Sequence, residues 1–234
     1  MFKYLSKIKE PSMRTLVLVS VWLACVSISA DGAIFDMNNP PAGTIRIIGG
    51  NSQGETGYAV RTIGDFSGDG IPDFAISSPL DNRVFIIFGR RNYPPVINLS
   101  FLATNGFVVN GNDNSGFGWS LGAPGDVDRD GRADLLIGAP FEGAGGRVYL
   151  LKGTFNLLPI HVSNEDKFLL ILEGADGESL GQVMGNGGDI NDDASSDLLI
   201  PSPFFVGQSN GQPVLGAAYV IYGKTAFENK IINT

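Results

Sequence analysis

The chain has 234 residues, enough for one domain or two with a sizeable apolar core. It carries 24 acidic and 16 basic residues, for a net charge of −8, and no stretch concentrates lysine and arginine. This balance argues against nucleic acid as a partner. Its 32 glycines and 13 prolines lie between short apolar runs, which favours an all-β fold.

Residues 1–30 have the pattern of a secretory signal peptide. Arg14 precedes an apolar run over residues 16–26, and small residues follow up to Ala30. The run is too short for a membrane span, so we expect cleavage near Ala30 and a secreted or cell-surface chain. The alternatives are an uncleaved anchor and, despite a poor lipobox, a lipoprotein cut before Cys25. Because Cys25 is the single cysteine, the mature chain would have no disulfide, and bound cations are the candidates for stabilising its loops.

Short apolar runs then recur with a period near 60 residues, after a polar lead-in over residues 31–43. Four strands are expected in each copy, over residues 44–48, 58–63, 74–77 and 83–88, then 106–111, 117–121, 135–137 and 147–151, then 168–172, 180–184, 198–200 and 217–222. The copies cover about residues 44–103, 104–166 and 167–234, and the last hairpin carries an insertion over residues 207–216. This period predicts an all-β fold of the β-propeller type with three four-stranded blades. A β-sandwich is the alternative by pattern alone.

Each copy is expected to form a whole blade, with no strand left over to close a ring. Three blades are fewer than the usual minimum of about four. An open arc, part of a longer product, and a subunit that completes its ring by self-association all remain open.

An acidic loop of nine residues recurs once in each copy. The loops read DFSGDGIPD at residues 65–73, DVDRDGRAD at residues 126–134 and DINDDASSD at residues 189–197, spaced by 61 and then 63 residues. A proline lies six residues after each last aspartate, and glycines lie eight residues and one residue before each first aspartate. Oxygen-bearing side chains that alternate around a glycine turn suit a hard cation. The loops therefore predict up to three Ca²⁺ sites.

In each loop we expect side-chain oxygens from places one, three, five and nine, and a backbone carbonyl from place seven. The predicted ligands are Asp65, Ser67, Asp69, Ile71 and Asp73, then Asp126, Asp128, Asp130, Arg132 and Asp134, then Asp189, Asn191, Asp193, Ser195 and Asp197. The loops are not EF-hands, because the twelfth place is isoleucine and no helices flank them. Aspartates that only form turns are the alternative, and bound ions with a purely structural role are another.

The three loops are not equivalent as cation sites. The second has four carboxylates, and the other two have three each, because Ser67 and Asn191 take the third place. The third loop also has Ala194 where a glycine belongs, which strains a turn with positive φ. We therefore expect affinity to fall from the second loop to the first and then to the third.

The repeats resemble the FG-GAP repeats of integrin alpha-chain propellers. The motif is present as Phe117-Gly118 with Gly138-Ala139-Pro140, and it is degenerate as Gly57-Tyr58 with Ser77-Ser78-Pro79 and as Gly181-Gln182 with Pro201-Ser202-Pro203. The resemblance covers about residues 44–223. It implies a β-propeller with calcium-binding loops and an extracellular role in cell adhesion or in binding a protein or glycan. Integrin chains have seven such repeats, and this chain has three.

No catalytic residues are expected. The stretch from Gly118 to Gly122 matches G-x-S-x-G, but the places that correspond to Ser120 hold Ala59 and Val183 in the other copies. FG-GAP repeats also accompany catalytic domains, as in glycosylphosphatidylinositol-specific phospholipase D, yet no catalytic domain remains outside the repeats here. The sequence thus predicts a non-enzymatic, secreted calcium-binding module. The alternatives are the non-catalytic propeller part of such a hydrolase and a structural assembly subunit.

Overall fold

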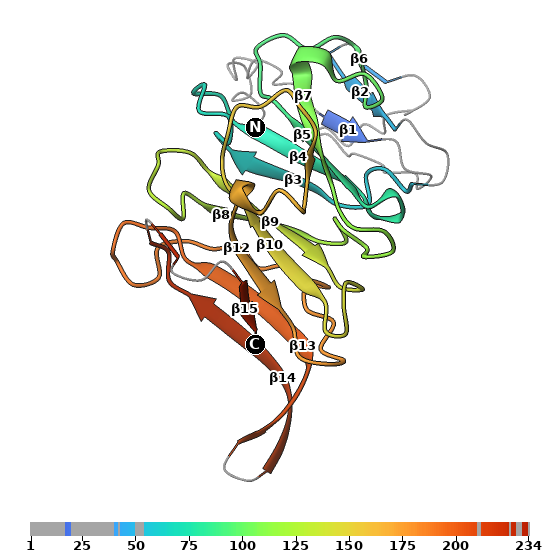
Figure 1. Ribbon diagram of the computed structural model, residues 1–234. Coiled ribbons are helices and arrows are strands. Elements are labelled where there is room, and N and C mark those ends of the chain that lie inside the picture. The colour runs from blue at the N-terminus through green and yellow to red at the C-terminus, as the bar shows by residue number, and fades with distance from the viewer. Residues whose placement is uncertain are drawn as a thin grey trace, which may run out of the picture.

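The computed structural model describes residues 17–19, 40–41, 43–49, 54–209, 212–224, 226–227 and 231–233. Within them the chain is all-β, with strands, three short 3₁₀ helices and no α-helix. The sheets follow one another in a row, as parts of a β-propeller do (Figure 1). No helix in these residues is long and apolar enough to cross a membrane. Apart from residues 17–19, the predicted signal peptide falls outside the described part of the chain.

Two five-stranded sheets form the middle of the row and share one strand order. The first contains β11 (Ile160–His161), β7 (Gly106–Asn110), β5 (Arg83–Ile87), β4 (Asp73–Ser78) and β3 (Val60–Gly64). The second contains β15 (Ile231–Asn233), β12 (Phe168–Glu173), β10 (Arg147–Leu151), β9 (Asp134–Ala139) and β8 (Leu121–Gly125). In both sheets four antiparallel strands are followed by a short parallel one at the edge.

Smaller sheets lie at the two ends of the row. One contains β1 (Val17–Val19), β2 (Ile45–Ile48) and β6 (Val96–Asn98), all parallel. The other is the hairpin of β13 (Leu198–Ser209) and β14 (Gln212–Ile221). The predicted insertion lengthens this hairpin, because pairing continues to Ser209 and Gln212. The 3₁₀ helices are η1 (Pro79–Asp81), η2 (Ala103–Asn105) and η3 (Glu165–Lys167).

The expectation that each sequence copy forms one whole sheet is wrong, because the sheets are offset from the copies by one strand. β7 comes from the second copy but pairs with β5 of the first, and β12 comes from the third copy but pairs with β10 of the second. Each sheet thus takes its first three strands from one copy and its fourth from the next. The predicted strand over residues 117–121 is also displaced, because β8 begins at Leu121. Residues 180–184 form no named strand, and Leu180 makes only an isolated bridge to Gly146.

Neighbouring sheets pack face to face around three apolar clusters. One fills the space between the two five-stranded sheets and includes Phe117, Leu135 and Tyr149. A second joins the β10 sheet to the β13–β14 hairpin, and a third joins the β4–β5 face to β2 and β6. Along β9, Leu135 and Ile137 enter the first cluster while Leu136 enters the second. This alternation explains why the strand reads as a continuous apolar run, since both faces of its sheet are buried.

Candidate metal centre

The first two acidic loops join the first two strands of the five-stranded sheets, the third loop precedes β13, and the three loops lie side by side. The amide of Ala133 in the second loop donates to the carbonyl of Asp65 in the first at 3.1 Å, and the amide of Ser196 in the third donates to the carbonyl of Asp126 at 2.9 Å. The eighth place of one loop is thus bonded to the first place of the loop before it. The loops form a connected rim at one end of the sheets.

The first aspartate of each loop organises the turn through its own backbone. In the second loop, Asp126 accepts the amides of Asp130 at 3.1 Å and Gly131 at 2.8 Å. The matching carboxylates of Asp65 and Asp189 accept the corresponding amides at 2.8–2.9 Å. These Asx-type bonds fold each loop around its leading carboxylate. The same bonds therefore recur in all three loops, although the intervening residues differ.

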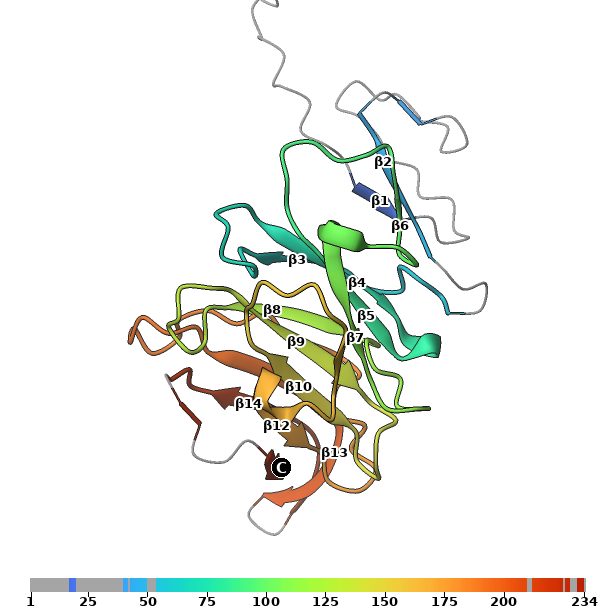
Figure 2. The same cartoon turned by 45° about the horizontal axis from the view of Figure 1, so that its top comes forward.

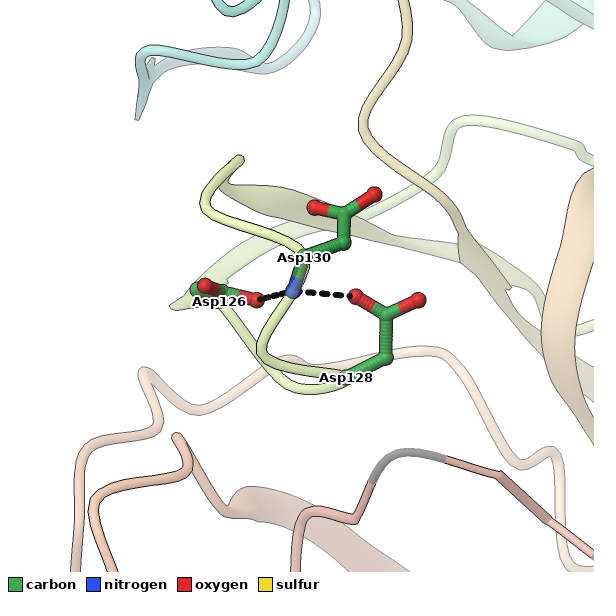
Figure 3. A group of neighbouring side chains, drawn as sticks. All are labelled: Asp126, Asp128 and Asp130. Atoms are coloured by element: carbon green, nitrogen blue, oxygen red, sulfur yellow. Dashed lines mark hydrogen bonds between the residues drawn. The ribbon is translucent and has the colours of Figure 1, made fainter.

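Three of the predicted ligands gather in the second loop. Single carboxylate oxygens of Asp126, Asp128 and Asp130 lie within 4.8 Å of one another, and no other group of three acidic, histidine or cysteine side chains in the described residues does so. Figure 3 shows the amide of Asp130 between the carboxylates of Asp126 and Asp128. Converging carboxylates without histidine or cysteine are suited to calcium rather than to zinc or copper.

The aspartate at place nine lies apart from this group and anchors the loop to the sheet. Asp134 is fully buried, and its oxygens accept the amides of Val127 at 2.9 Å and Gly153 at 2.8 Å. Asp197 is equally buried and accepts the equivalent amides of Ile190 and Gly223. Asp73, also buried, accepts the amide of Gly89 and, one place later in its loop, that of Ser67. Place nine therefore ties its loop to the glycine that follows the third strand. Each oxygen retains a lone pair with which to contact a cation.

The residues at place seven are fixed by their amides. Those of Ile71, Arg132 and Ser195 donate to the carboxylate at place five of the same loop, at 2.8–2.9 Å. At place three, Asn191 accepts the amide of Asp193 at 3.1 Å, whereas the buried hydroxyl oxygen of Ser67 has no hydrogen-bond partner in the described chain. A buried oxygen without a partner is costly, and a cation in the first loop would supply one. The residues present thus fit a hard cation.

Two basic side chains reach the predicted sites, and the sequence reasoning missed both. Lys152 Nζ forms ion pairs with Asp128 and with Asp130, the second at 3.1 Å. Arg129 extends from the second loop to the third, where its guanidinium pairs with Asp193 at 2.9 Å. Lys152 directly precedes Gly153, and the corresponding residues before Gly89 and Gly223 are Phe88 and Tyr222. A comparison of the repeats would therefore have identified Lys152 as exceptional.

Several ionisable groups at the rim have shifted pKa values. The hydrogen bond to Asp128 raises the pKa of Lys152, and the amide of Ser195, with help from Asn191 and Arg129, lowers the pKa of Asp193. Burial raises the pKa of Asp73, and it raises that of Asp134 to about 7, although both accept backbone hydrogen bonds. Desolvation therefore outweighs hydrogen bonding at Asp73 and Asp134.

The raised pKa of Asp134 predicts an unusual pH dependence without metal. A carboxyl with a pKa near 4 in the unfolded chain and about 7 in the folded one favours folding only while it is protonated. The free energy of unfolding of the metal-free chain should therefore fall as pH rises from about 4 to 7, by up to about 4 kcal/mol. Urea unfolding of the chain and of Asp134→Asn across this range checks the prediction. An equal slope in the two proteins would contradict it.

Ala194 offers a second test of the loop geometry. The sixth place has φ of +85° at Gly70, +88° at Gly131 and +67° at Ala194, so the alanine adopts a conformation that costs about 1–2 kcal/mol. Ala194→Gly should raise the free energy of unfolding by about 0.5–1 kcal/mol, after the greater flexibility of glycine in the unfolded chain is deducted. Ala144→Gly, at an exposed alanine without positive φ, should lower it. Equal effects in urea titrations would refute the assigned strain.

Comparisons with known proteins agree with this geometry. The FG-GAP repeat family model matches residues 117–151, which contain Phe117-Gly118, the second loop and the strands on both sides of it. Integrin alpha pat-2 of Caenorhabditis briggsae is 29% identical over 180 residues, or 71% of this chain and 14% of that protein. Integrin alpha-PS5 of Drosophila melanogaster is 30% identical over 174 residues, or 73% and 17%.

A relative of another kind matches a shorter part of the chain. Phosphatidylinositol-glycan-specific phospholipase D of Mus musculus is 33% identical over 135 residues, or 53% of this chain and 14% of that protein. The chain thus spans 14–17% of the length of these three relatives. The matched motif lies in the described fold as an acidic loop between two strands of a propeller-like sheet. The chain is therefore an FG-GAP repeat protein, similar to integrin alpha chains over most of its length.

Proposed function

We propose that this chain is a secreted calcium-binding propeller module that binds an extracellular protein or glycan, as in integrin-alpha-like adhesion. The convergence of Asp126, Asp128 and Asp130 in the loop that the family model matches is the observation that carries the proposal. The predicted signal peptide favours an extracellular location. The module has no catalytic role in this proposal.

Calcium would act on the fold through the connected rim. An ion in the second loop would compensate three close carboxylates and displace Lys152 from Asp128 and Asp130. Because Ala133 and Ser196 bond each loop to the one before it, an ion that orders one loop also steadies its neighbours. Up to three ions then hold the sheets together in a chain without structural disulfides. Their role is structural, which leaves recognition to another surface.

A row of three aromatic side chains, two exposed and one half-buried, is the candidate for such a surface at the opposite rim. Tyr58 precedes β3, Trp119 precedes β8 and Phe141 follows β9, so all three lie away from the acidic loops. The ring centroids are 5.0 Å apart for Tyr58 and Trp119, and 4.9 Å apart for Trp119 and Phe141. Tyr58 is 44% exposed and Phe141 is 52% exposed, and Trp119 between them is half-buried. A row of accessible rings suits stacking against a sugar ring or an apolar side chain of a ligand.

Calorimetric titration of the full chain with calcium tests the metal part of the proposal. The chain should bind calcium, and Asp128→Asn should weaken the strongest site at least tenfold, because it removes a charged ligand. Asp176→Asn, at an exposed aspartate outside the loops, is the matched control and should change nothing. Absence of binding by the unaltered chain would end the calcium proposal.

Attachment of cultured cells to a surface coated with the full chain tests the adhesive part. Cells should attach in calcium and attach less after chelation. Trp119→Ala should reduce attachment at unchanged calcium affinity, whereas Phe155→Ala, at an exposed aromatic outside this row, should not. Calcium binding without attachment would remove the adhesive role and leave the metal sites intact.

The 33% identity to a phospholipase D favours a second candidate, the non-catalytic part of a secreted hydrolase. In that case the full chain would not itself cleave a phosphatidylinositol-glycan anchor, but it would bind vesicles that carry such anchors. Binding to these vesicles without attachment of anchor-free cells would favour this candidate over the adhesive one.

A further inference from the structure

The sheets of the row are incomplete at its two ends in complementary ways. In both five-stranded sheets the third strand pairs with a fourth, which pairs in parallel with a fifth. These strands are β5, β7 and β11 in one sheet and β10, β12 and β15 in the other. At one end β14 is a third strand, and it pairs with no fourth strand among the described residues. At the other end β2 and β6 have the order of a fourth and a fifth strand. One end thus lacks the element that the other end carries.

The register identifies β2 as a fourth strand. Ile47 pairs in parallel with Ile97, as Val109 pairs with Ile160 and Leu172 with Ile232. The next bonds also correspond, because the amide of Leu99 donates to Ile48 and that of Val162 donates to Asn110, both at 3.0 Å. β2 therefore has the position and pairing of β7 and β12, and the described residues include no first three strands of a sheet beside it.

Side-chain exposure at the two ends shows where neighbours are missing. Val60 in β3 is 48% exposed, whereas Leu121 at the same repeat position is 4% exposed against the preceding sheet. Val220 in β14 is 49% exposed, whereas Leu150 at the matching position is 1% exposed against the following sheet. The same apolar positions are thus buried inside the row and open to solvent at its ends.

One chain does not bring these two ends together. Both views place β2 and β14 at opposite ends of the row (Figures 1 and 2). In the five-stranded sheets, one edge of the fourth strand pairs with the third strand: β7 pairs with β5, and β12 pairs with β10. On β2 the corresponding edge pairs with β1. Because β1 belongs to the predicted signal peptide, its removal would free that edge. An open strand edge beside exposed valines is an adhesive surface.

We propose that β2 of one copy pairs antiparallel with β14 of a second copy and completes its sheet. The registers of β5 with β7 and β10 with β12 place Ile48 opposite Ala217 and Ile47 opposite Ala218. Val60 of the first copy then faces Val220 of the second. Each copy then contributes its two five-stranded sheets and the sheet of its β13–β14 hairpin, which β2 and β6 of the other copy complete. Two copies joined in this way at both ends form a closed ring, whose size is within the range of roughly four to eight blades found in propellers.

Solution mass tests the pairing on the folded full chain. A protease site placed after Ala30 allows the mass to be measured by light scattering before and after cleavage. Cleavage should convert a monomer into a dimer. A monomer after cleavage at concentrations up to about 100 μM would overturn the proposal, and so would a mass that grows continuously with concentration, because an open chain of copies is not a closed pair.

Charge substitutions at the exposed valines test the interface without disturbing the core. Val60→Glu and Val220→Lys should each keep the cleaved chain monomeric, since both sites are solvent-exposed in one copy. The double variant should recover at least tenfold in association, because the two charges then face each other. Leu158→Glu, at a side chain 72% exposed elsewhere, should remain dimeric. Dimers of both single variants would refute this interface.

Cysteine pairing tests the register itself. In a Cys25→Ser background, Ile48→Cys with Ala217→Cys should form a disulfide-linked dimer on mild oxidation. Arg46→Cys with Ala217→Cys, which is two residues out of register, should link much more slowly. Equal yields from the two pairs would contradict the proposed strand pairing.

Discussion

Gly181→Ala is expected to lower the free energy of unfolding by about 2–5 kcal/mol. Gly181 has φ of +90°, and a Cβ atom there would lie 2.5 Å from the carbonyl oxygen of Arg147 and 2.9 Å from the amide nitrogen of Ala139. The substitution would thus add a cost of about 1–2 kcal/mol for the backbone conformation and about 1–3 kcal/mol for overpacking. Both contacts are backbone atoms of the preceding sheet, so they cannot rotate away.

Gly177→Ala is the matched control for this prediction. Its φ is +81°, and a Cβ atom there would meet nothing within 4 Å. It should therefore cost only the conformational part, about 1–2 kcal/mol. Urea unfolding of both variants under identical conditions separates the two contributions. A loss at Gly177 as large as that at Gly181 would show that close packing between sheets is not what requires glycine.

The same packing explains the glycine of the repeat motif. Gly118 has φ of +89°, and a Cβ atom there would lie 2.9 Å from the side chains of Ser77 and Val84 in the preceding sheet. Gly118 and Gly181 thus occupy equivalent contacts at successive sheet interfaces. The motif glycine allows the segment before each loop to approach the sheet before it.

Removal of calcium is expected to lower the melting temperature of the full chain by about 5–10 °C. One site at a free calcium concentration of about 100 times its Kd contributes about 2.7 kcal/mol, and a domain of this size shifts by about 2–4 °C per kcal/mol. The second loop should supply most of the change, because Asp126, Asp128 and Asp130 converge there. Calorimetric scans in calcium and in a chelator measure it.

Variants of the three loops locate the stabilisation. Asp128→Asn should remove most of the calcium-dependent shift, and Asn191→Ala in the third loop should remove less. Lys152→Met should increase calcium affinity, because the ion no longer competes with an ammonium group for Asp128 and Asp130. A larger loss from the third loop than from the second would contradict the expected order of affinity. A melting temperature insensitive to calcium in every variant would contradict the metal sites altogether.

Local pattern determined the fold class and the position of the candidate sites. The period near 60 residues and the apolar runs predicted an all-β chain of propeller type, which the sheets confirm. The predicted loops are present between β3 and β4 and between β8 and β9, and the third precedes β13. Ala194 has the positive φ that its place in the repeat implied. These features depend on neighbouring residues, so side-chain alternation and turn chemistry are sufficient to reveal them.

Tertiary structure alone decided which strands share a sheet and which charges meet. The sequence repeat looks the same whether its first strand completes its own sheet or the preceding one, and only the pairing of β7 with β5 resolves that choice. The contacts of Lys152 with Asp128 and of Arg129 with Asp193 join residues 24 and 64 positions apart. The burial that raises the pKa of Asp134 also depends on the folded chain, in which Asp134 accepts the amide of the distant Gly153. Such distances and burial arise only when the sheets pack together, so no local pattern contains them.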